Sequence, residues 1–374
     1  MLENRKKILY IITGLNVGGA ENMLYKLASS LDKNKYKISI ICLINSGKMA
    51  KKLQALDVNV ICMGIRFSPS AVIKWFKLIG IIKKENPDIV QTWMYHADLL
   101  GGLAAYIAGK KNIIWSIRQS SFTLISNKTK FIAKLCALLS NKIPKKIVSN
   151  SYYAKATHVR FGYSRGKIKI IPNGFEITVN KNEKGREDFR KQLHIPMDTV
   201  LFGALGRHAP EKGYPWLLDC ISKISTIQKN FCLLIVGKNV INCPVLKEKI
   251  KKYNLQNRVY LLDEQENVAF FFSSIDCYIS SSLSEGFSNA LGEAMSFGLP
   301  CIVTRAGDSA HILNNNDFVV TPNDVNELSS SMSKMIDMTK NQRDEIGLKA
   351  KLRLSKKYEL SKIVNQFDKL YQEY

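Results

Sequence analysis

The 374-residue sequence predicts two α/β domains, each built on a parallel sheet. Short apolar runs such as 8–13 (ILYIIT) alternate with helical patterns, as in parallel sheets whose strands are buried on both faces. The alternation pauses at 168–176 (IKIIPNGFE), where Pro-Asn-Gly is a turn signal, and it restarts at 199–206 (TVLFGALG). A chain of this length can also bury two separate cores. These observations favour an α/β fold with a boundary near residue 176.

The strand-like runs follow one another in the order that a sheet with right-handed crossovers requires. In the first half they lie at 8–13, 38–44, 58–63, 89–93, 112–117 and 146–149, with helical patterns between most of them. In the second half they lie at 199–206, 231–237, 259–262 and 276–282. The polar stretch 177–187 suits an interdomain linker. We therefore expect domains at 1–176 and 188–358.

A glycine-rich turn follows the first strand and precedes a helix at 20–31. This order predicts that a phosphate or another ligand oxygen meets backbone amides near Gly18 and Gly19. The spacing is not G-x-G-x-x-G, so the fingerprint of nicotinamide dinucleotides is absent. A tight turn without a ligand is the alternative.

Two further loops at strand ends carry candidate catalytic side chains. His96 lies in 94–98 (MYHAD), and Arg118 begins 118–121 (RQSS). Both can reach a ligand at the carboxyl edge of the first sheet, where open α/β sheets bind ligands. An ordinary loop histidine is the alternative interpretation of His96.

Two segments of the first half combine apolar positions with many lysines. They are 126–146 (SNKTKFIAKLCALLSNKIPKK) and 71–84 (AVIKWFKLIGIIKK). Such helices can lie on an anionic membrane surface. They can equally be core-packing helices with a solvated lysine rim, because any surface helix of an α/β domain is amphipathic.

Two cations flank the first turn of the second half, in GRHAPEKG. Arg207 and Lys212 flank a turn at the carboxyl end of a strand, where two cations can neutralise negative charge that grows on a leaving group, as a metal ion otherwise does. The sequence has no D-x-D triplet to hold a metal, so it favours the cationic route without metal or cofactor. A solvated turn is the alternative when the pair is considered alone.

Two glutamates, Glu285 and Glu293, lie eight residues apart around a strand–loop–helix turn at 281–304. Gly286 permits unusual backbone angles, and Ser288 or Asn289 can cap the helix that follows. The helix start offers amides and a positive dipole end to a phosphate. A solvated surface charge is the alternative for Glu293.

Composition limits the class of partner. There are 55 Lys and Arg against 31 Asp and Glu, which gives a formal charge of +24. Such an excess attracts an anionic membrane surface, phosphorylated substrates or nucleic acid; the last is disfavoured because the sequence has no recognisable nucleic-acid motif. The eight cysteines are scattered without metal spacing, and no signal peptide or spanning segment is evident. We expect a cytoplasmic protein, either soluble or peripheral on the inner membrane.

The stretch EGFSNALGEAMSFGLP resembles the E-x7-E signature of retaining glycosyltransferases of family four. GRHAPEKG, GLNVGGAE and the IPNG turn are similar to further motifs of that family. The resemblance implies the GT-B fold, which has two facing Rossmann-like domains, a cleft between them, and a C-terminal helix, here 359–374, that crosses back to the N-terminal domain.

The resemblance also implies roles for residues. Glu285 would contact the donor sugar with the amides of Gly286 and Phe287, and Glu293 would bind the ribose diol. Arg207 and Lys212 would grip the diphosphate, which would rest on the helix start formed by Ser288, Asn289 and Ala290. Many relatives carry histidine where Arg118 lies, so Arg118 either replaces that histidine or binds an anionic group of the acceptor.

The implied activity is transfer of a sugar, with retention and without a metal, from a nucleotide-diphosphate sugar to a hydroxyl acceptor. The expected donor is a UDP-sugar, and the expected acceptor is a lipid-linked glycan of bacterial surface polysaccharide such as capsule or O-antigen. Two alternatives stay open: a nucleotide-sugar epimerase of the same fold, and a non-catalytic partner subunit that binds nucleotide sugar or membrane.

Overall fold

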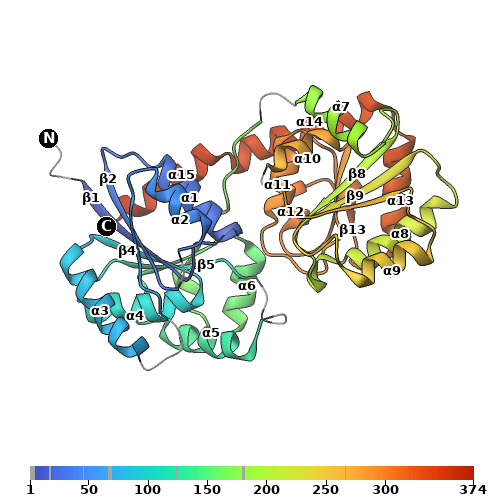
Figure 1. Ribbon diagram of the computed structural model, residues 1–374. Helices are drawn as coiled ribbons and strands as arrows, with labels where there is room; N and C mark the ends of the chain where they lie inside the picture. Colours follow the sequence, from blue (N-terminus) through green and yellow to red (C-terminus); the bar gives the residue numbers. More distant parts are fainter. Residues whose placement is uncertain are drawn as a thin grey trace. The chain divides into compact units, whose positions relative to one another are not determined.

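The structure, a computed structural model, describes residues 5–16, 18–44, 46–65, 70–120, 122, 125–178, 182–265 and 267–374. The chain divides into two compact units, each with its own sheet. Unit 1 contains Met1–Gly174 and Leu360–Tyr374, and unit 2 contains Phe175–Glu359 (Figure 1). We expected the chain to divide after residues 176 and 358, and in the structure it divides after residues 174 and 359.

Unit 1 is built on a parallel sheet with the strand order β3-β2-β1-β4-β5-β6-β7. Ile8 of β1 pairs with Ile38 of β2 and with Ile89 of β4, so the order reverses between β1 and β4. Ligands of open α/β sheets bind at the carboxyl ends of the strands beside such a reversal. The strands are β1 (Lys6–Ile12), β2 (Tyr36–Cys42), β3 (Asn59–Cys62), β4 (Ile89–Trp93), β5 (Ile113–Ile117), β6 (Lys146–Ser149) and β7 (Ile168–Ile170).

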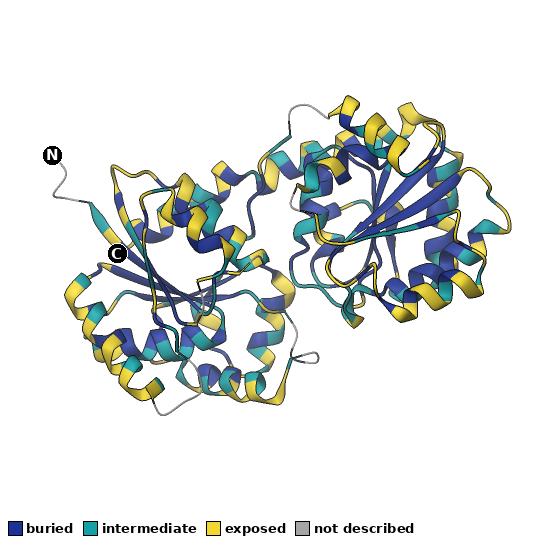
Figure 2. Cartoon of the chain, viewed as in Figure 1, coloured by how far each residue is buried: buried dark blue, intermediate teal, exposed yellow. Residues whose placement is uncertain are grey.

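Helices cover both faces of this sheet, which explains why its strands are apolar on both sides (Figure 2). Tyr10 and Ile12 pack in one cluster with α1 (Gly19–Ser30), α2 (Lys48–Gln54) and α15 (Leu360–Gln372). Leu9 and Ile11 pack in the other, with the helices α3 (Ser70–Glu85), η1 (Ala97–Gly101), α4 (Gly102–Ile107), α5 (Asn127–Leu139) and α6 (Tyr152–Arg160). A short turn of helix, η2 (Arg165–Lys167), leads into β7.

The C-terminal helix α15 belongs to the core of unit 1, as predicted. Ile363 and Phe367 are fully buried in the same cluster as Tyr10. The Tyr371 hydroxyl donates to Gln91 Oε1 at 2.5 Å and lies 3.0 Å from the Tyr10 hydroxyl. The helix is therefore held by apolar packing and by a buried polar network.

Unit 2 repeats the architecture with the strand order β10-β9-β8-β11-β12-β13, which reverses between β8 and β11. Its strands are β8 (Val200–Leu205), β9 (Phe231–Val236), β10 (Val259–Leu262), β11 (Cys277–Ser280), β12 (Cys301–Thr304) and β13 (Val319–Val320). Its helices are α7 (Glu183–Gln192), η3 (Pro210–Lys212), α8 (Tyr214–Ser225), α9 (Pro244–Lys252), α10 (Val268–Ser274), α11 (Asn289–Ser296), α12 (Ser309–Leu313), η4 (Asn316–Phe318), α13 (Val325–Asp337) and α14 (Lys340–Tyr358).

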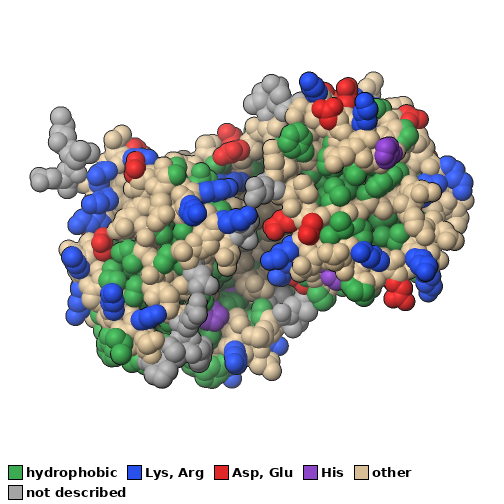
Figure 3. Space-filling view, in the orientation of Figure 1, with side chains coloured by type: hydrophobic (Ala, Val, Ile, Leu, Met, Phe, Trp, Pro, Cys, Tyr) green, Lys and Arg blue, Asp and Glu red, His purple; other side chains and the backbone are tan. Residues whose placement is uncertain are grey.

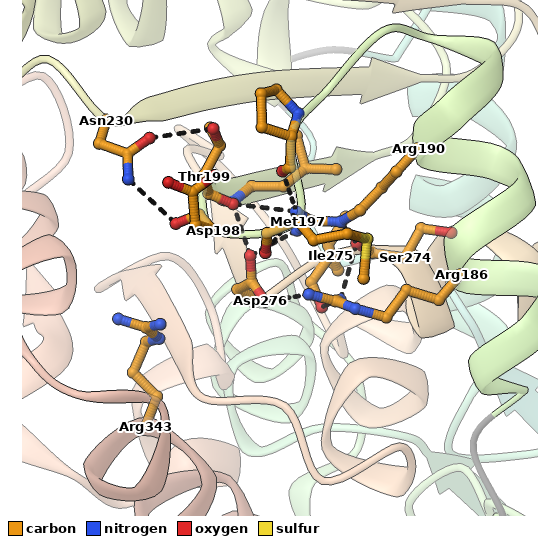
Figure 4. A network of polar contacts seen from close by, with 12 residues as sticks. Arg186, Arg190, Met197, Asp198, Thr199, Asn230, Ser274, Ile275, Asp276 and Arg343 are labelled. Carbon is orange, nitrogen blue, oxygen red and sulfur yellow. Dashed lines mark hydrogen bonds and ion pairs between the residues drawn. The ribbon is translucent and has the colours of Figure 1, made fainter.

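The expected linker at 177–187 is wrong in its second part, because α7 begins at Glu183 and is anchored in unit 2. Arg186 and Arg190 each bind one carboxylate oxygen of Asp276 at 2.6 Å, and Arg190 is fully buried (Figure 4). Both guanidiniums also donate to the Ser274 carbonyl. Arg186, one of the charged residues that suggested a solvated linker, therefore holds α7, together with Arg190, against Asp276 directly before β11.

Candidate functional site

The carboxyl end of β11 positions Glu285 through a run of buried serines. The Ser282 hydroxyl donates to Glu285 Oε1 at 2.8 Å, and the Thr304 hydroxyl at the end of β12 donates to the Ser282 carbonyl at 2.5 Å. Ser281 and Ser282 are both buried. The loop that carries Glu285 is thereby tied to the ends of two neighbouring strands.

Lys212, at the end of η3, lies against Glu285. Its Nζ is 2.5 Å from Glu285 Oε1, with side-chain exposures of 21% for Lys212 and 13% for Glu285. The two loops are also joined by the Ser281 hydroxyl, which donates to the Lys212 carbonyl at 2.8 Å. Because a charge-assisted pair in a partly buried site is stronger than a surface pair, this contact fixes both side chains.

Two glycines allow the backbones of the site to approach closely. Gly213 has φ +66°, and a Cβ there would lie 2.3 Å from the Ser281 carbonyl oxygen. Gly307 has φ +56°, and a Cβ there would lie 2.1 Å from the Glu285 carbonyl oxygen. Only glycine adopts these angles without strain while leaving that space. Sequence reasoning missed Gly307, whose signal is the Ala-Gly-Asp turn directly after β12.

Arg207 lies on the same loop as Lys212 but does not contact Glu285 in the structure. Its Nη2 is 2.8 Å from Glu211 Oε1, and its side chain is 69% exposed. Glu211, which sequence reasoning missed, also accepts a backbone hydrogen bond from Leu283 at 2.7 Å. The structure therefore brings Lys212 and Glu285 into contact, whereas Arg207 pairs with Glu211 and lies exposed at the rim of the site.

Helix α11 begins beside Glu285, with Ser288 as the residue before its first turn. No side-chain cap bond is made by Ser288, so the first amides of the helix, from Asn289 and Ala290 onward, keep the general capacity of a helix start for an anion. The Gly286 carbonyl accepts from the Asp308 amide at 3.0 Å, which holds the loop.

Two further predicted site residues lie near this helix start. Phe287 is buried and stacks on Phe175 with ring centroids 6.0 Å apart, so its side chain serves packing. Glu293 is the fifth residue of α11 and is half-buried. Its side chain therefore lies one helical turn away from the amides of the helix start.

A carboxylate lies beside the glycine turn of unit 1. Gly18 precedes α1 and Gly19 is its first residue. A Cβ on Gly18 would lie 2.5 Å from Glu21 Oε2, and burial raises the pKa of Glu21. Sequence reasoning missed this carboxyl group, which lies beside Gly18, one of the two residues where a phosphate was expected.

His96 and Arg118 follow β4 and β5 in unit 1. His96 is half-buried, and burial lowers its pKa, so it is neutral near pH 7. The Arg118 guanidinium lies 4.0 Å from the centre of the Trp93 ring, and its Nη1 donates to Asn173 Oδ1 at 2.8 Å. The structure thus gathers side chains from the ends of β4, β5 and β7 around Arg118.

Asp98, in η1, is a fully buried carboxyl group that sequence reasoning missed although it lies in the MYHAD loop. Its Oδ1 accepts from the Thr92 hydroxyl at 2.5 Å and from the Ser116 amide at 3.4 Å. Its Oδ2 is buried and has no hydrogen-bond partner. Burial raises the pKa of Asp98 to about 8, although Thr92, Ser116 and the charge of Arg118 oppose that rise.

A groove of about 720 Å³ in unit 2 is lined by none of the predicted site residues. Among its cations, Arg353 donates to the Ile312 carbonyl at 2.8 Å and Lys349 pairs with Glu345 at 2.7 Å. Both therefore serve local structure. The remaining lining is Leu313, Asn314, Asn315, Asp317, Phe318, Lys334, Met338, Ile346, Ala350, Lys356 and Lys357.

Within the described ranges, no three His, Cys, Asp or Glu side chains gather as a metal site requires. All eight cysteines are free, and seven are buried as expected, whereas Cys62 is exposed. Over the same described residues, no helix is long and apolar enough to cross a membrane.

Family comparison covers both halves of the chain. Residues 17–179 match Glycosyltransferase Family 4, and residues 185–353 match Glycosyl transferases group 1. The two matched ranges contain Arg118 in one case and Lys212, Glu285 and Glu293 in the other.

Several curated proteins are similar to the chain. The UDP-Gal:alpha-D-GlcNAc-diphosphoundecaprenol alpha-1,3-galactosyltransferase of Escherichia coli is 24% identical over 349 residues, which are 88% of this chain and 89% of that protein. The capsular polysaccharide biosynthesis glycosyltransferase CapM of Staphylococcus aureus is 24% identical over 310 residues, 79% of each protein. The uncharacterized glycosyltransferase MJ1059 of Methanocaldococcus jannaschii is 31% identical over 250 residues, 61% of this chain and 58% of that protein.

Solved structures share the fold. HepE of Anabaena in complex with UDP and glucose superposes with a TM-score of 0.87 at 20% identity, covering 99% of this chain and 100% of that chain. A glycosyltransferase from Rickettsia africae superposes with a TM-score of 0.85 at 22% identity, covering 99% of this chain and 98% of that chain. Two parallel-sheet α/β units of this kind are the GT-B fold, which confirms the predicted fold class.

Proposed function

Because the chain belongs to glycosyltransferase family four and is a glycosyltransferase, we propose that it transfers a sugar from a UDP-sugar to an acceptor hydroxyl, with retention and without a metal. The single observation that carries the proposal is the contact between Lys212 and Glu285 beside the start of α11. A cation and a carboxylate beside the start of a helix at one sheet edge are the groups that a nucleotide sugar requires, which supports the proposal.

Each predicted site residue of unit 2 has a defined part in the proposed reaction. The donor diphosphate rests on the start of α11 and on Lys212, with Arg207 closing over it from the rim. The negative charge that grows on the leaving diphosphate is stabilised by these fixed groups. Glu285 holds the sugar hydroxyls together with the amides of Gly286 and Phe287, and Glu293 accepts hydrogen bonds from the ribose.

Retention follows if the acceptor attacks on the face from which the diphosphate departs. No carboxylate then has to act as a nucleophile at the anomeric carbon. Glu285 is then a binding group and not a nucleophile, which agrees with its contacts with Lys212 and Ser282. The departing diphosphate takes the acceptor proton.

We place the acceptor on a lipid carrier. Support comes from the relative in Escherichia coli, whose name specifies a diphosphoundecaprenol-linked acceptor, and from the capsular polysaccharide relative in Staphylococcus aureus. The product is then part of a bacterial surface polysaccharide. Because such carriers lie in the membrane, the enzyme works in the cytoplasm at the membrane surface.

The surface of unit 1 supports contact with an anionic membrane. Ile73 on α3 is 73% exposed and Leu138 on α5 is 72% exposed, and Phe76 and Phe131 are exposed on the same helices. Lysines accompany them along both helices, and Figure 3 shows hydrophobic and basic side chains side by side on this part of unit 1. Apolar side chains among lysines match an anionic bilayer surface.

Vesicle binding tests the membrane contact. Wild type is expected to sediment with phosphatidylglycerol vesicles, while Ile73→Ser and Leu138→Ser stay in solution. Leu352→Ser is the matched control, because Leu352 is 61% exposed on α14 of unit 2. Equal sedimentation of all variants would contradict an interface on α3 and α5.

Ligand-induced stabilisation tests the donor. A UDP-sugar that binds the native state is expected to raise the melting temperature of wild type, and less so that of Lys212→Gln. Incubation with that donor and a diphosphate-linked acceptor should then yield glycosylated product. Isomerised donor without transfer would select the epimerase, and binding without any turnover would select a partner subunit.

A further inference from the structure

Arg118 has two buried hydrogen-bond donors inside unit 1 that have no partner. Of its three guanidinium nitrogens, Nη1 donates to Asn173 Oδ1 at 2.8 Å. Nε and Nη2 are buried and have no hydrogen-bond partner. These two nitrogens lie on the same side of the planar group and form the fork that binds two oxygens of one carboxylate or phosphate.

The local structure fixes that fork in place. The guanidinium lies 4.0 Å from the centre of the Trp93 ring, a cation–π contact that sets its plane. The Asn173 bond sets its rotation within that plane. The guanidinium is thus fixed by Trp93 and Asn173 while its Nε–Nη2 edge has no hydrogen-bond partner, so it is preorganised for a ligand.

Leaving Nε and Nη2 of Arg118 buried without partners costs folding free energy. A buried cation requires partners, and unsatisfied buried donors are rare in native structures. Burial lowers the pKa of Arg118 to about 9, although the charge of Asp98 favours the charged form. Asp98 does not fill the fork, because its only bonded oxygen, Oδ1, accepts from Thr92 and Ser116.

We propose that the Nε–Nη2 edge of Arg118 binds an oxyanion, phosphate or carboxylate, carried by the acceptor. This inference rests on the proposed function for the distinction between donor and acceptor. Unit 2 already supplies Lys212, Arg207 and the start of α11 to the donor diphosphate, whereas Arg118 belongs to the unit whose exposed apolar helices would meet a lipid carrier. Because both nitrogens are buried, the anion enters with a local opening of the chain around them.

The experiment compares Arg118→Gln, Arg118→Met and Arg118→Lys with wild type and with Arg165→Gln, which removes an exposed arginine of the same unit. Inorganic pyrophosphate and acetate, at constant ionic strength, are added to protein saturated with UDP, and the melting temperature is measured. A shift with pyrophosphate alone identifies phosphate as the occupant, and a shift with acetate identifies carboxylate.

The expected result is a shift in wild type and Arg165→Gln that is lost in Arg118→Gln and Arg118→Met and is reduced in Arg118→Lys, which keeps the charge without the fork. Without ligand, Arg118→Met should melt no lower than wild type, because it removes an unpaired buried charge. A shift that survives in Arg118→Gln or is absent from wild type, or a lower melting temperature of Arg118→Met, would overturn the proposal.

UDP binding separates this inference from the proposed function. The Kd for UDP should not change in Arg118→Gln, and weakening by about tenfold would assign Arg118 to the donor instead. If UDP does not bind wild type at all, the proposed function fails. The difference in pyrophosphate shift between wild type and Arg118→Gln, measured without UDP, still decides whether Arg118 holds the anion.

Discussion

The carboxyl edges of the two sheets treat charge in opposite ways. In unit 2, Lys212 and Glu285 neutralise each other, and deeper in the same unit Asp276 neutralises two arginines. In unit 1, Asp98 keeps one buried oxygen unpartnered and Arg118 keeps two buried nitrogens unpartnered. The charges named in unit 2 are therefore paired, whereas the unpartnered groups of Asp98 and Arg118 carry an electrostatic cost that a ligand can remove.

The largest expected effect is a pH dependence of stability caused by Asp98. Its absence would contradict the contrast between the unpartnered groups of unit 1 and the paired charges of unit 2. Its raised pKa means that the folded state keeps a proton that an unfolded aspartate releases above pH 3.8, so wild type loses stability as pH rises toward about 8. The loss is up to about 1.4 kcal/mol for each pH unit. Denaturant unfolding of wild type and Asp98→Asn across this range should show the variant gaining relative stability with pH. A constant difference would mean that Asp98 ionises normally.

The next effect concerns the paired charges that anchor α7. Asp276→Asn leaves the guanidiniums of Arg186 and Arg190 without their counter-charge, and we expect a loss of about 3–5 kcal/mol of stability. Denaturant unfolding measures the loss, with Asp198→Asn as the control because Asp198 is exposed. If both variants unfold alike, the network contributes nothing and the contrast between the units is mistaken.

The third effect concerns turnover. Lys212→Gln removes the cation beside Glu285, and we expect a decrease in kcat of about 10²–10³-fold, the size seen when one group that stabilises transition-state charge is removed. Lys247→Gln, an exposed lysine of α9, is the matched control. Unchanged circular dichroism would show that the fold survives. Wild-type turnover in Lys212→Gln would remove the pair from the site.

The smallest expected effect is a loss of stability when the buried hydrogen-bond network of α15 in unit 1 is broken. Tyr371→Phe deletes the hydroxyl that donates to Gln91 Oε1, leaving a buried acceptor unsatisfied at a cost of about 1–3 kcal/mol. Thermal unfolding should report this lower melting temperature with UDP binding unchanged. No change in melting temperature would contradict the prediction and show that another group, such as water, replaces the hydroxyl at Gln91 Oε1.

The fold was largely predictable because its strands are continuous apolar runs. The expected ranges 89–93, 146–149 and 259–262 coincide with β4, β6 and β10 to the residue. The expected linker at 177–187 fails because local composition cannot reveal that Arg186 has a partner at Asp276, 90 positions later in the sequence. A charged segment has the same pattern whether it is solvated or clamped.

The candidate site was predictable in its residue types but not in its distances. Motif spacing indicated that Lys212 and Glu285 share a site, and the structure places them in contact. The exposure of Arg207 and its ion pair with Glu211 depend on loop geometry that spacing does not encode. Asp98 escaped notice because burial, which makes it unusual, arises only when η1 packs on β4 and β5.

The return of α15 to unit 1 has a consequence for biosynthesis. The chain leaves unit 1 at Gly174 and comes back only at Leu360, so the ribosome completes all of unit 2 while the face that receives Phe367 and Tyr371 is still bare. We therefore expect the nascent N-terminal half to wait, with apolar surface available to chaperones, until the last fifteen residues emerge. Truncation before Leu360 should accordingly yield aggregates in which unit 2 alone is native.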